Sequence, residues 1–269
     1  MNDLEPFARL VQALDPWRQQ LVFIGGWAHR LHRLDPRANQ LEHQPVFTRD
    51  TDLAFANKEV IEGDIKSALI GHGFQEELGG DHTPPVAHYT LGQEEGGFYA
   101  EFLTPLVGSG IKRGGKPDAT LAKGGIVAQK IRHLDILLVD PWVISLRQED
   151  GIPVSAPKDI QVTHPLCFMV QKFLIQDDRP FAKKAQDVLY IYDTIELFGA
   201  LLGEFHEHWV RRVEPELGNA AKIVRERAQR TFSQVNDVVR AAAQIPADRS
   251  LSAQQIQATC QHAFGIVLS

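Results

Sequence analysis

The sequence changes character near residue 158, and this change limits the folds that the chain can adopt. Up to that point, short apolar runs alternate with turns rich in glycine and proline, a pattern typical of strands and short helices in a mixed sheet. Beyond it, apolar residues recur at helical spacing with few breaks. We therefore predict an α+β fold, with a mixed β-sheet domain over residues 1–158 and an all-helical domain over residues 159–269.

The local patterns also predict individual elements. Strands are expected over residues 21–24, 46–56, 87–91, 98–103, 131–139 and 142–146. Helices are expected over residues 4–20, 27–34, 58–72, 165–177, 181–198, 202–213, 215–244 and 251–264. A glycine-rich turn at residues 94–97 is predicted to join two strands as a hairpin, and residues 35–45 and 106–125 are predicted to be loops.

The composition is that of a globular protein and excludes several other classes. With 43% hydrophobic and 23% charged residues among 269, the chain is neither disordered nor a coiled coil. A net charge of −6 argues against a globally basic nucleic-acid-binding protein, although it is compatible with a local basic patch. No apolar stretch approaches the ~20 residues that span a bilayer, and the acidic N-terminus lacks a signal-peptide pattern, so we expect a cytoplasmic protein without a membrane partner.

Local spacing does not indicate a metal site built from cysteine or histidine. Cys167 and Cys260 lie far apart in apolar stretches, which indicates neither a disulfide framework nor a cysteine-based zinc site. His206 and His208 lack the i, i+4 spacing of a zinc-binding helix, so we expect them at the surface.

The strongest local signal for chemistry is a pair of aspartates in an apolar strand. Asp50 and Asp52 are two residues apart, so on a strand their side chains project from the same face. Two carboxylates held that close repel each other unless a cation lies between them, and Mg²⁺ takes such oxygen ligands. The alternative is a solvated strand face, but aspartate is disfavoured in strands and the neighbouring Leu53 and Phe55 indicate burial.

Two other segments complete a candidate site. Gly25 and Gly26 stand between a predicted strand and a predicted helix, where backbone N–H groups can approach a phosphate closely. Glu101 is a single carboxylate in an otherwise apolar strand, and burying it without a partner is costly. A metal shared with the two aspartates is one such partner, and a salt bridge to an arginine is the other.

These motifs together resemble the DNA polymerase β-like nucleotidyltransferase superfamily. The strings that carry the resemblance are GGWA from residue 25, T-x-D-x-D-L from residue 48, and the acidic residue of a later strand. The helical part is similar to the minimal, abortive-infection-type (type IV toxin-like) members, with matching residues at His164, Pro165, Lys172, Arg179, Lys183, Lys184 and Asp187. The resemblance covers residues 21–198. Two departures are the long segment between the glycines and the aspartates, and a glycine at position 26 where many members carry serine.

The resemblance implies a mixed β-sheet nucleotidyltransferase core, a two-metal site and a nucleotide site. Two Mg²⁺ or Mn²⁺ ions would be held by Asp50, Asp52 and Glu101, which are also the implied catalytic residues. An NTP such as ATP would be bound by Gly25, Gly26, Thr48, Lys172, Lys184 and Asp187. The lysines are expected to border a cleft that faces the aspartates, and the alternative is that they lie on a solvated helix surface.

The acceptor is the least determined part of the predicted reaction. The resemblance implies transfer of an NMP to a hydroxyl of a tRNA, a protein or a small molecule, by an enzyme that is a toxin or phage-defence component with a cognate antitoxin. A basic stretch that could receive a tRNA end, or balance the acidic site, comprises Lys112, Arg113, Lys116, Lys123, Lys130 and Arg132. The alternative function is a catalytically idle nucleotidyltransferase fold used for binding or regulation.

Overall fold

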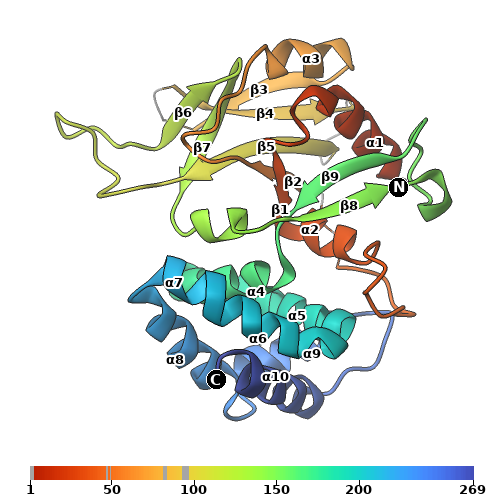
Figure 1. Cartoon of the computed structure of the whole chain (residues 1–269), viewed down its shortest axis with the longest axis vertical. Helices are drawn as coiled ribbons and strands as arrows, with labels where there is room; N and C mark the ends of the chain where they lie inside the picture. Colours follow the sequence, from red (N-terminus) through yellow and green to blue (C-terminus); the bar gives the residue numbers. More distant parts are fainter. Residues whose placement is uncertain (1–2, 47, 49, 81–83, 93–96) are drawn as a thin grey trace. The chain divides into compact units, whose positions relative to one another are not determined.

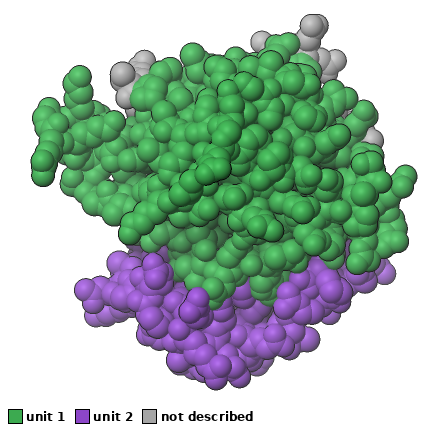
Figure 2. Space-filling view, turned by 45° about the horizontal axis from the view of Figure 1, so that its top comes forward, with its two compact units in different colours: residues 1–34, 47–163 green, residues 35–46, 164–269 purple. Residues whose placement is uncertain are grey.

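The computed structural model of the chain describes residues 3–46, 48, 50–80, 84–92 and 97–269. Backbone contacts divide the chain into two compact units, coloured separately in Figure 2. Residues 1–34 and 47–163 form one, here called the sheet unit, and residues 35–46 and 164–269 form the other, here called the helical unit. The assignment of a catalytic domain to residues 1–158 and a helical domain to residues 159–269 stays a prediction.

The described residues of the sheet unit form one nine-stranded mixed sheet (Figure 1). Its strands are β1 (Val22–Ile24), β2 (Asp50–Ala54), β3 (Gln75–Gly79), β4 (Val86–Leu91), β5 (Phe98–Pro105), β6 (Thr120–Lys123), β7 (Ile126–Ile131), β8 (Trp142–Leu146) and β9 (Lys158–Val162). Their order is β3-β4-β5-β2-β1-β9-β8, and β7 pairs with the end of β5 and with β6. β2 runs parallel to β5, and β1 runs parallel to β9, which makes the sheet mixed.

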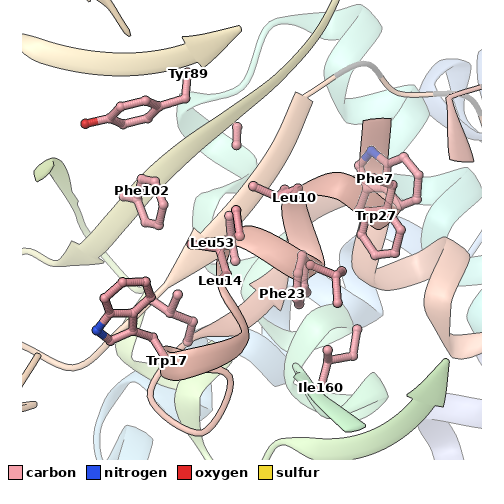
Figure 3. Packing of buried hydrophobic residues seen from close by; sticks show 14 of the residues in the cluster. Phe7, Leu10, Leu14, Trp17, Phe23, Trp27, Leu53, Tyr89, Phe102 and Ile160 are labelled. Atoms are coloured by element: carbon pink, nitrogen blue, oxygen red, sulfur yellow. The ribbon is translucent and has the colours of Figure 1, made fainter. Parts of the chain in front are cut away.

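Helices of the sheet unit pack an aromatic core against the sheet (Figure 3). They are α1 (Leu4–Ala13), α2 (Gly25–His32) and α3 (Ile65–Gly71), with single 3₁₀ turns at Asp15–Trp17, Asp135–Leu138 and Gln148–Asp150. Phe7 of α1 stacks on Trp27 of α2 at a centroid distance of 4.2 Å, and Phe23 of β1 meets Phe7 edge-on. This core therefore fixes the start of α2 relative to β1.

The alternation of β2 and β5 separates a core face from a polar face. Leu53 on β2 and Phe102 on β5 are fully buried in the core (Figure 3). Because side chains alternate along a strand, their neighbours Asp52 and Glu101 project from the opposite face. The sheet thus carries the predicted acidic residues on the side away from its packed aromatic core.

Several strand predictions are confirmed, and one is wrong. The strands predicted at 87–91 and 98–103 are β4 and β5, which pair antiparallel, although the predicted turn at 94–97 lies largely outside the described residues. The strand predicted over 131–139 is wrong, because β7 ends at Ile131 and His133 adopts a φ of 59°. The residues that follow form a 3₁₀ turn that buries the adjacent Ile136 and Leu137, which strand alternation does not allow.

Four strands were not predicted from the sequence: β3, β6, β9, and β7, of which only the last residue, Ile131, lies in a predicted strand. β3 is a mostly polar edge strand, so it lacks the apolar alternation that marks a half-buried strand. β6 is short and lies within the glycine-rich segment predicted to be a loop. The predicted helix over 4–20 also ends early, at Ala13, and Pro16 lies in the 3₁₀ turn that follows.

The helical unit consists of α4 (Pro165–Ile175), α5 (Phe181–Phe198), α6 (Leu202–His208), α7 (Glu214–Leu217), α8 (Ala220–Phe232), α9 (Asp237–Ala243) and α10 (Ala253–Val267). A π-helical turn, Trp209–Val213, joins α6 to α7. The single helix predicted over 215–244 is wrong, because Gly218 has a φ of 52° and Asn236 caps the start of α9 through its side chain. The α+β class itself is confirmed.

Residues 35–46 lie between two elements of the sheet unit but belong to the helical unit. The backbone N–H of Asn39 donates to the carbonyl of Leu197, and its side chain donates to the carbonyl of Glu196 at the end of α5. The backbone N–H of Gln44 donates to the carboxylate of Asp248. The predicted loop is therefore held to the helical unit by hydrogen bonds at Asn39 and Gln44. Within the part of the chain that the structure describes, no helix combines the length and apolarity needed to cross a membrane.

Candidate functional site

Three carboxylates meet on the polar face of the sheet. The parallel register of β2 and β5 places Asp52 beside Glu101, and Asp50 beside Tyr99. One carboxylate oxygen from each of Asp50, Asp52 and Glu101 lies within 4.8 Å of the others. All three residues are partly buried. The three acidic residues singled out in the sequence are therefore brought together by strand pairing.

Gly25 brings the start of α2 against this cluster. Ile24, the last residue of β1, pairs with Asp52, and α2 begins at the next residue. Gly25 has a φ of +64°, and a Cβ atom built on it would lie 1.9 Å from Oδ2 of Asp52. Glycine is therefore required twice at this position, for its backbone conformation and for the close approach of a carboxylate. The positive end of the helix dipole favours the negative charge placed there.

The carboxyl of Glu101 lies in an environment that disfavours its charged form. Burial raises the pKa of the Glu101 carboxyl above its ordinary value, and the charge of the nearby Asp50 adds a smaller contribution. His88 on β4, with Nε2 at 3.4 Å from Oε2 of Glu101, and a hydrogen bond with Asp52 act in the opposite direction. The raised pKa therefore reflects loss of solvent at Glu101 more than repulsion within the cluster.

Tyr99 is a further neighbour of the carboxylates. Burial raises the pKa of its hydroxyl to about 12, and the charges of Asp50, Glu101 and Asp52 contribute to this shift. The rings of Tyr99 and His88 lie 5.7 Å apart. Sequence reasoning missed both residues. His88 lies opposite Glu101 because of the antiparallel register of β4 and β5. The predicted hairpin between these two strands is therefore the sequence feature from which this contact could have been found.

Thr48 is also at the cluster. Its hydroxyl donates a hydrogen bond to Oδ1 of Asp50, which orients that carboxylate. Arg49, the residue between them, lies outside the described residues. Gly26 follows Gly25 in the first turn of α2. Of the predicted nucleotide-binding residues, Gly25, Gly26 and Thr48 therefore belong to the unit that carries the carboxylates.

The remaining predicted nucleotide-binding residues lie in the helical unit. Lys172 on α4 is buried, with its Nζ 3.1 Å from Oδ1 of Asp187 on α5. Arg179 donates to the same carboxylate through Nε at 3.0 Å. Lys184 is half-buried one turn before Asp187. The alternative of a solvated surface does not hold for Lys172, whereas a cleft shared by these residues and the aspartates stays a prediction.

The chemistry of the cluster fits a divalent cation. Hard cations such as Mg²⁺ and Mn²⁺ bind oxygen ligands, and three converging carboxylates supply them. The raised pKa of Glu101 supports the fit, because an added positive charge would relieve the repulsion that causes part of the shift. The arrangement is therefore suited to hold metal ions beside a helix N-terminus that can accept a phosphate.

Comparison with known proteins identifies a family. A family model described as Nucleotidyltransferase matches residues 2–214. The matched range includes the three carboxylates, Gly25, and the ion-paired residues of α4 and α5. A search of the curated proteins finds no significant match.

We expect Gly25→Ala to weaken metal binding by about 10–100-fold, because the new Cβ would displace the carboxylate of Asp52. The positive φ should also cost roughly 1–2 kcal/mol of stability. Titration with Mn²⁺ followed by electron paramagnetic resonance, together with thermal unfolding, measures both effects. Gly151→Ala is the matched control, because Gly151 has a φ of +79° and no atom within 4 Å of its built Cβ. Equal Mn²⁺ affinity in the two variants would contradict the role assigned to Gly25.

We expect Glu101→Gln to stabilise the metal-free protein at neutral pH by about 2–4 °C in Tm, corresponding to roughly 1 kcal/mol. Because the folded-state pKa of Glu101 is raised, the stability linked to its protonation is present below the ordinary carboxyl pKa and is lost as pH rises through the folded value. The Tm gap between variant and wild type should therefore open as pH increases from acidic to neutral. Glu77→Gln, an exposed glutamate on β3, should show no such gap. A Tm gap that is independent of pH would overturn the assignment.

Proposed function

Since the chain belongs to the nucleotidyltransferase family, we propose that it transfers an NMP from an NTP, such as ATP, to a hydroxyl acceptor. The observation that carries the proposal is the convergence of Asp50, Asp52 and Glu101 beside the start of α2. Acidic clusters are common on protein surfaces. Here the cluster lies beside a helix N-terminus, in a chain whose family performs nucleotidyl transfer. That reaction needs carboxylates that hold metal ions and a backbone site that accepts phosphate.

Asp50, Asp52 and Glu101 are the residues that would hold the metal ions of the reaction. When bound, Mg²⁺ or Mn²⁺ supplies positive charge that activates a hydroxyl nucleophile and stabilises the charge on the triphosphate and the leaving pyrophosphate. Thr48 keeps Asp50 in orientation through its hydrogen bond. His88 does the same for Glu101, with Nε2 of His88 lying 3.4 Å from Oε2 of the carboxylate.

The phosphates of the NTP would be bound at the start of α2. The backbone N–H groups of Gly25 and Gly26 lie in the first turn of that helix, where anions are favoured. The acceptor oxygen would attack the α-phosphorus as the bond to pyrophosphate breaks, and the proton of the hydroxyl would pass to one of the three carboxylates.

Lys172, Lys184 and Asp187 are proposed to form the helical part of the nucleotide site. Lys172 and Arg179 together outweigh the single charge of Asp187, so the trio keeps an excess of one positive charge. An excess cation held by a buried carboxylate is well oriented for a phosphate group. Lys184 would add a second, more accessible positive charge.

The six residues of the basic stretch differ in exposure and in hydrogen-bond partners, and this difference supports an anionic acceptor. Lys123 and Lys130 are partly buried, Arg132 is exposed, and all three hydrogen-bond to carbonyls or to Asp118. Lys112, Arg113 and Lys116 are exposed on the loop that follows β5, and Nζ of Lys112 also lies 3.8 Å from Oδ1 of Asp118. A tRNA end is the acceptor class that this exposed charge favours, while a protein acceptor stays an outcome of the labelling experiment. The abortive-infection-type resemblance supports a toxin or phage-defence role with a cognate antitoxin.

Asp50→Asn and Asp52→Asn should each reduce transfer from a labelled NTP by at least about 100-fold, because each removes a carboxylate that would hold the metal ions. The measurement is incorporation of label into total tRNA or lysate protein in the presence of Mg²⁺. The matched control is Asp159→Asn, since Asp159 is an exposed carboxylate on β9 of the same sheet. Full transfer by both site variants would exclude the mechanism. Calorimetry that finds no Mg²⁺-dependent NTP binding by the wild type would favour the idle, regulatory fold instead.

The triple substitution of Lys112, Arg113 and Lys116 by Ala should reduce labelling of tRNA by about tenfold or more, with a weaker dependence on salt, because fewer phosphates are contacted. Affinity for NTP should be unchanged. Replacing three exposed basic residues elsewhere, Lys58, Arg147 and Lys222, changes the net charge equally and should leave labelling intact. Equal losses in the two triple variants would show a general charge effect rather than a binding loop.

A further inference from the structure

The helical unit contains a second cluster of metal-binding side chains, His164, Cys167 and His208. One donor atom from each residue lies within 4.8 Å of the others. His164 and Cys167 are buried, with 6% and 0% of their surfaces exposed, and His208 is half-buried. The nucleotidyl transfer proposed above uses none of these three residues, so the cluster needs its own explanation.

Two elements that are distant in sequence build this cluster. His164 is the N-cap of α4, and Cys167 follows three residues later, so both side chains lie on one side of its first turn. His208 is the last residue of α6. The imidazole rings of His164 and His208 stack with centroids 4.0 Å apart and an interplanar angle of 13°. Sequence spacing could not find this cluster, because its third member comes from another helix.

The backbone at His208 is irregular, which is a second observation at the same place. The π-helical turn Trp209–Val213 begins directly after His208. Its first and last residues, Trp209 and Val213, are fully buried. π-Helical turns are rare and are frequently found at functional sites. Here the irregular turn starts directly after the residue whose ring contacts His164.

Charge repulsion disfavours two protonated histidines in this cluster. Two imidazolium rings stacked at 4.0 Å would repel each other strongly in a buried site. Nδ1 of His164 accepts a hydrogen bond from the backbone N–H of Leu166 at 3.1 Å, so this nitrogen is unprotonated and its lone pair points into the first turn of α4. Metal ions bind neutral imidazole and deprotonated thiol, so binding at this cluster would release the proton of Cys167.

We propose that His164, Cys167 and His208 bind a Zn²⁺ ion. Two nitrogens and one sulfur suit Zn²⁺, whereas the carboxylates of the sheet unit suit harder ions such as Mg²⁺. A tetrahedral zinc ion has four ligands, so water at the half-buried His208 side would complete the set. At Nδ1 of His164 the metal would replace the hydrogen bond from Leu166, and the two rings would turn out of their parallel stack so that a nitrogen lone pair of each points at the ion. The ion then ties the first turn of α4 to the end of α6 and stabilises the helical unit.

Cobalt substitution of the full-length protein tests this proposal. We expect one Co²⁺ ion per chain to give a near-ultraviolet thiolate-to-cobalt absorption band, and one equivalent of Zn²⁺ to remove it. The band should persist in the Asp50→Asn, Asp52→Asn double variant, because carboxylates give no thiolate band. This readout does not depend on transfer activity, so the zinc site and the proposed function can fail separately.

Matched variants identify the ligands. Cys167→Ser should abolish the band, and Cys260→Ser should retain it, since Cys260 is the other buried cysteine and lies on α10. His208→Gln should weaken Co²⁺ binding by more than about tenfold, and it decides the question if Cys167→Ser does not fold. The proposal is overturned if the wild type gives no thiolate band, if Cys167→Ser keeps it, or if His208→Gln binds Co²⁺ as the wild type does.

Discussion

Repulsion among three carboxylates is the constraint around which the sheet unit is organised. Asp50, Asp52 and Glu101 would move apart if their backbones were free, and strand pairing prevents this. On the opposite face of the same two strands, Leu53 and Phe102 are fully buried among the aromatic side chains of α1 and α2. Burial of that core supplies the free energy that keeps the strands in register. The free energy gained by packing on the core face therefore offsets the electrostatic cost of placing three carboxylates together on the other face of the sheet.

Most of the candidate site could be predicted from the sequence because its residues break local rules. Two aspartates and one glutamate stand in strands whose other residues are apolar, and a glycine pair interrupts a strand-to-helix transition. Their convergence required the pairing of β2 with β5, which lie far apart in the chain. His88 was not predicted as a site residue because a histidine on a half-buried strand is not unusual. Its relevance comes from lying opposite Glu101 in the β4–β5 register.

The fold was predicted best where one residue pattern controls the structure, and worst where tertiary contacts do. Long amphipathic helices such as α5 matched their predicted ranges. The edge strand β3 is specified by its hydrogen bonds to β4 rather than by apolar alternation, so no local signal marks it. Lys172 shows the same limit at the level of a side chain. Its buried position depends on Asp187 and the ring of Tyr190, both on α5, as well as on the ring of Phe168 one turn earlier on α4.

Residues 35–46 determine whether the two units can be separated by cutting the chain. The chain passes between the sheet unit and the helical unit three times, after residues 34, 46 and 163, so neither unit is a contiguous stretch. A fragment that begins at residue 164 would lose the partners that Leu197 and Asp248 find in Asn39 and Gln44. A single cut after residue 163 therefore does not separate the two units, because residues 35–46 of the helical unit remain attached to the sheet unit's part of the chain.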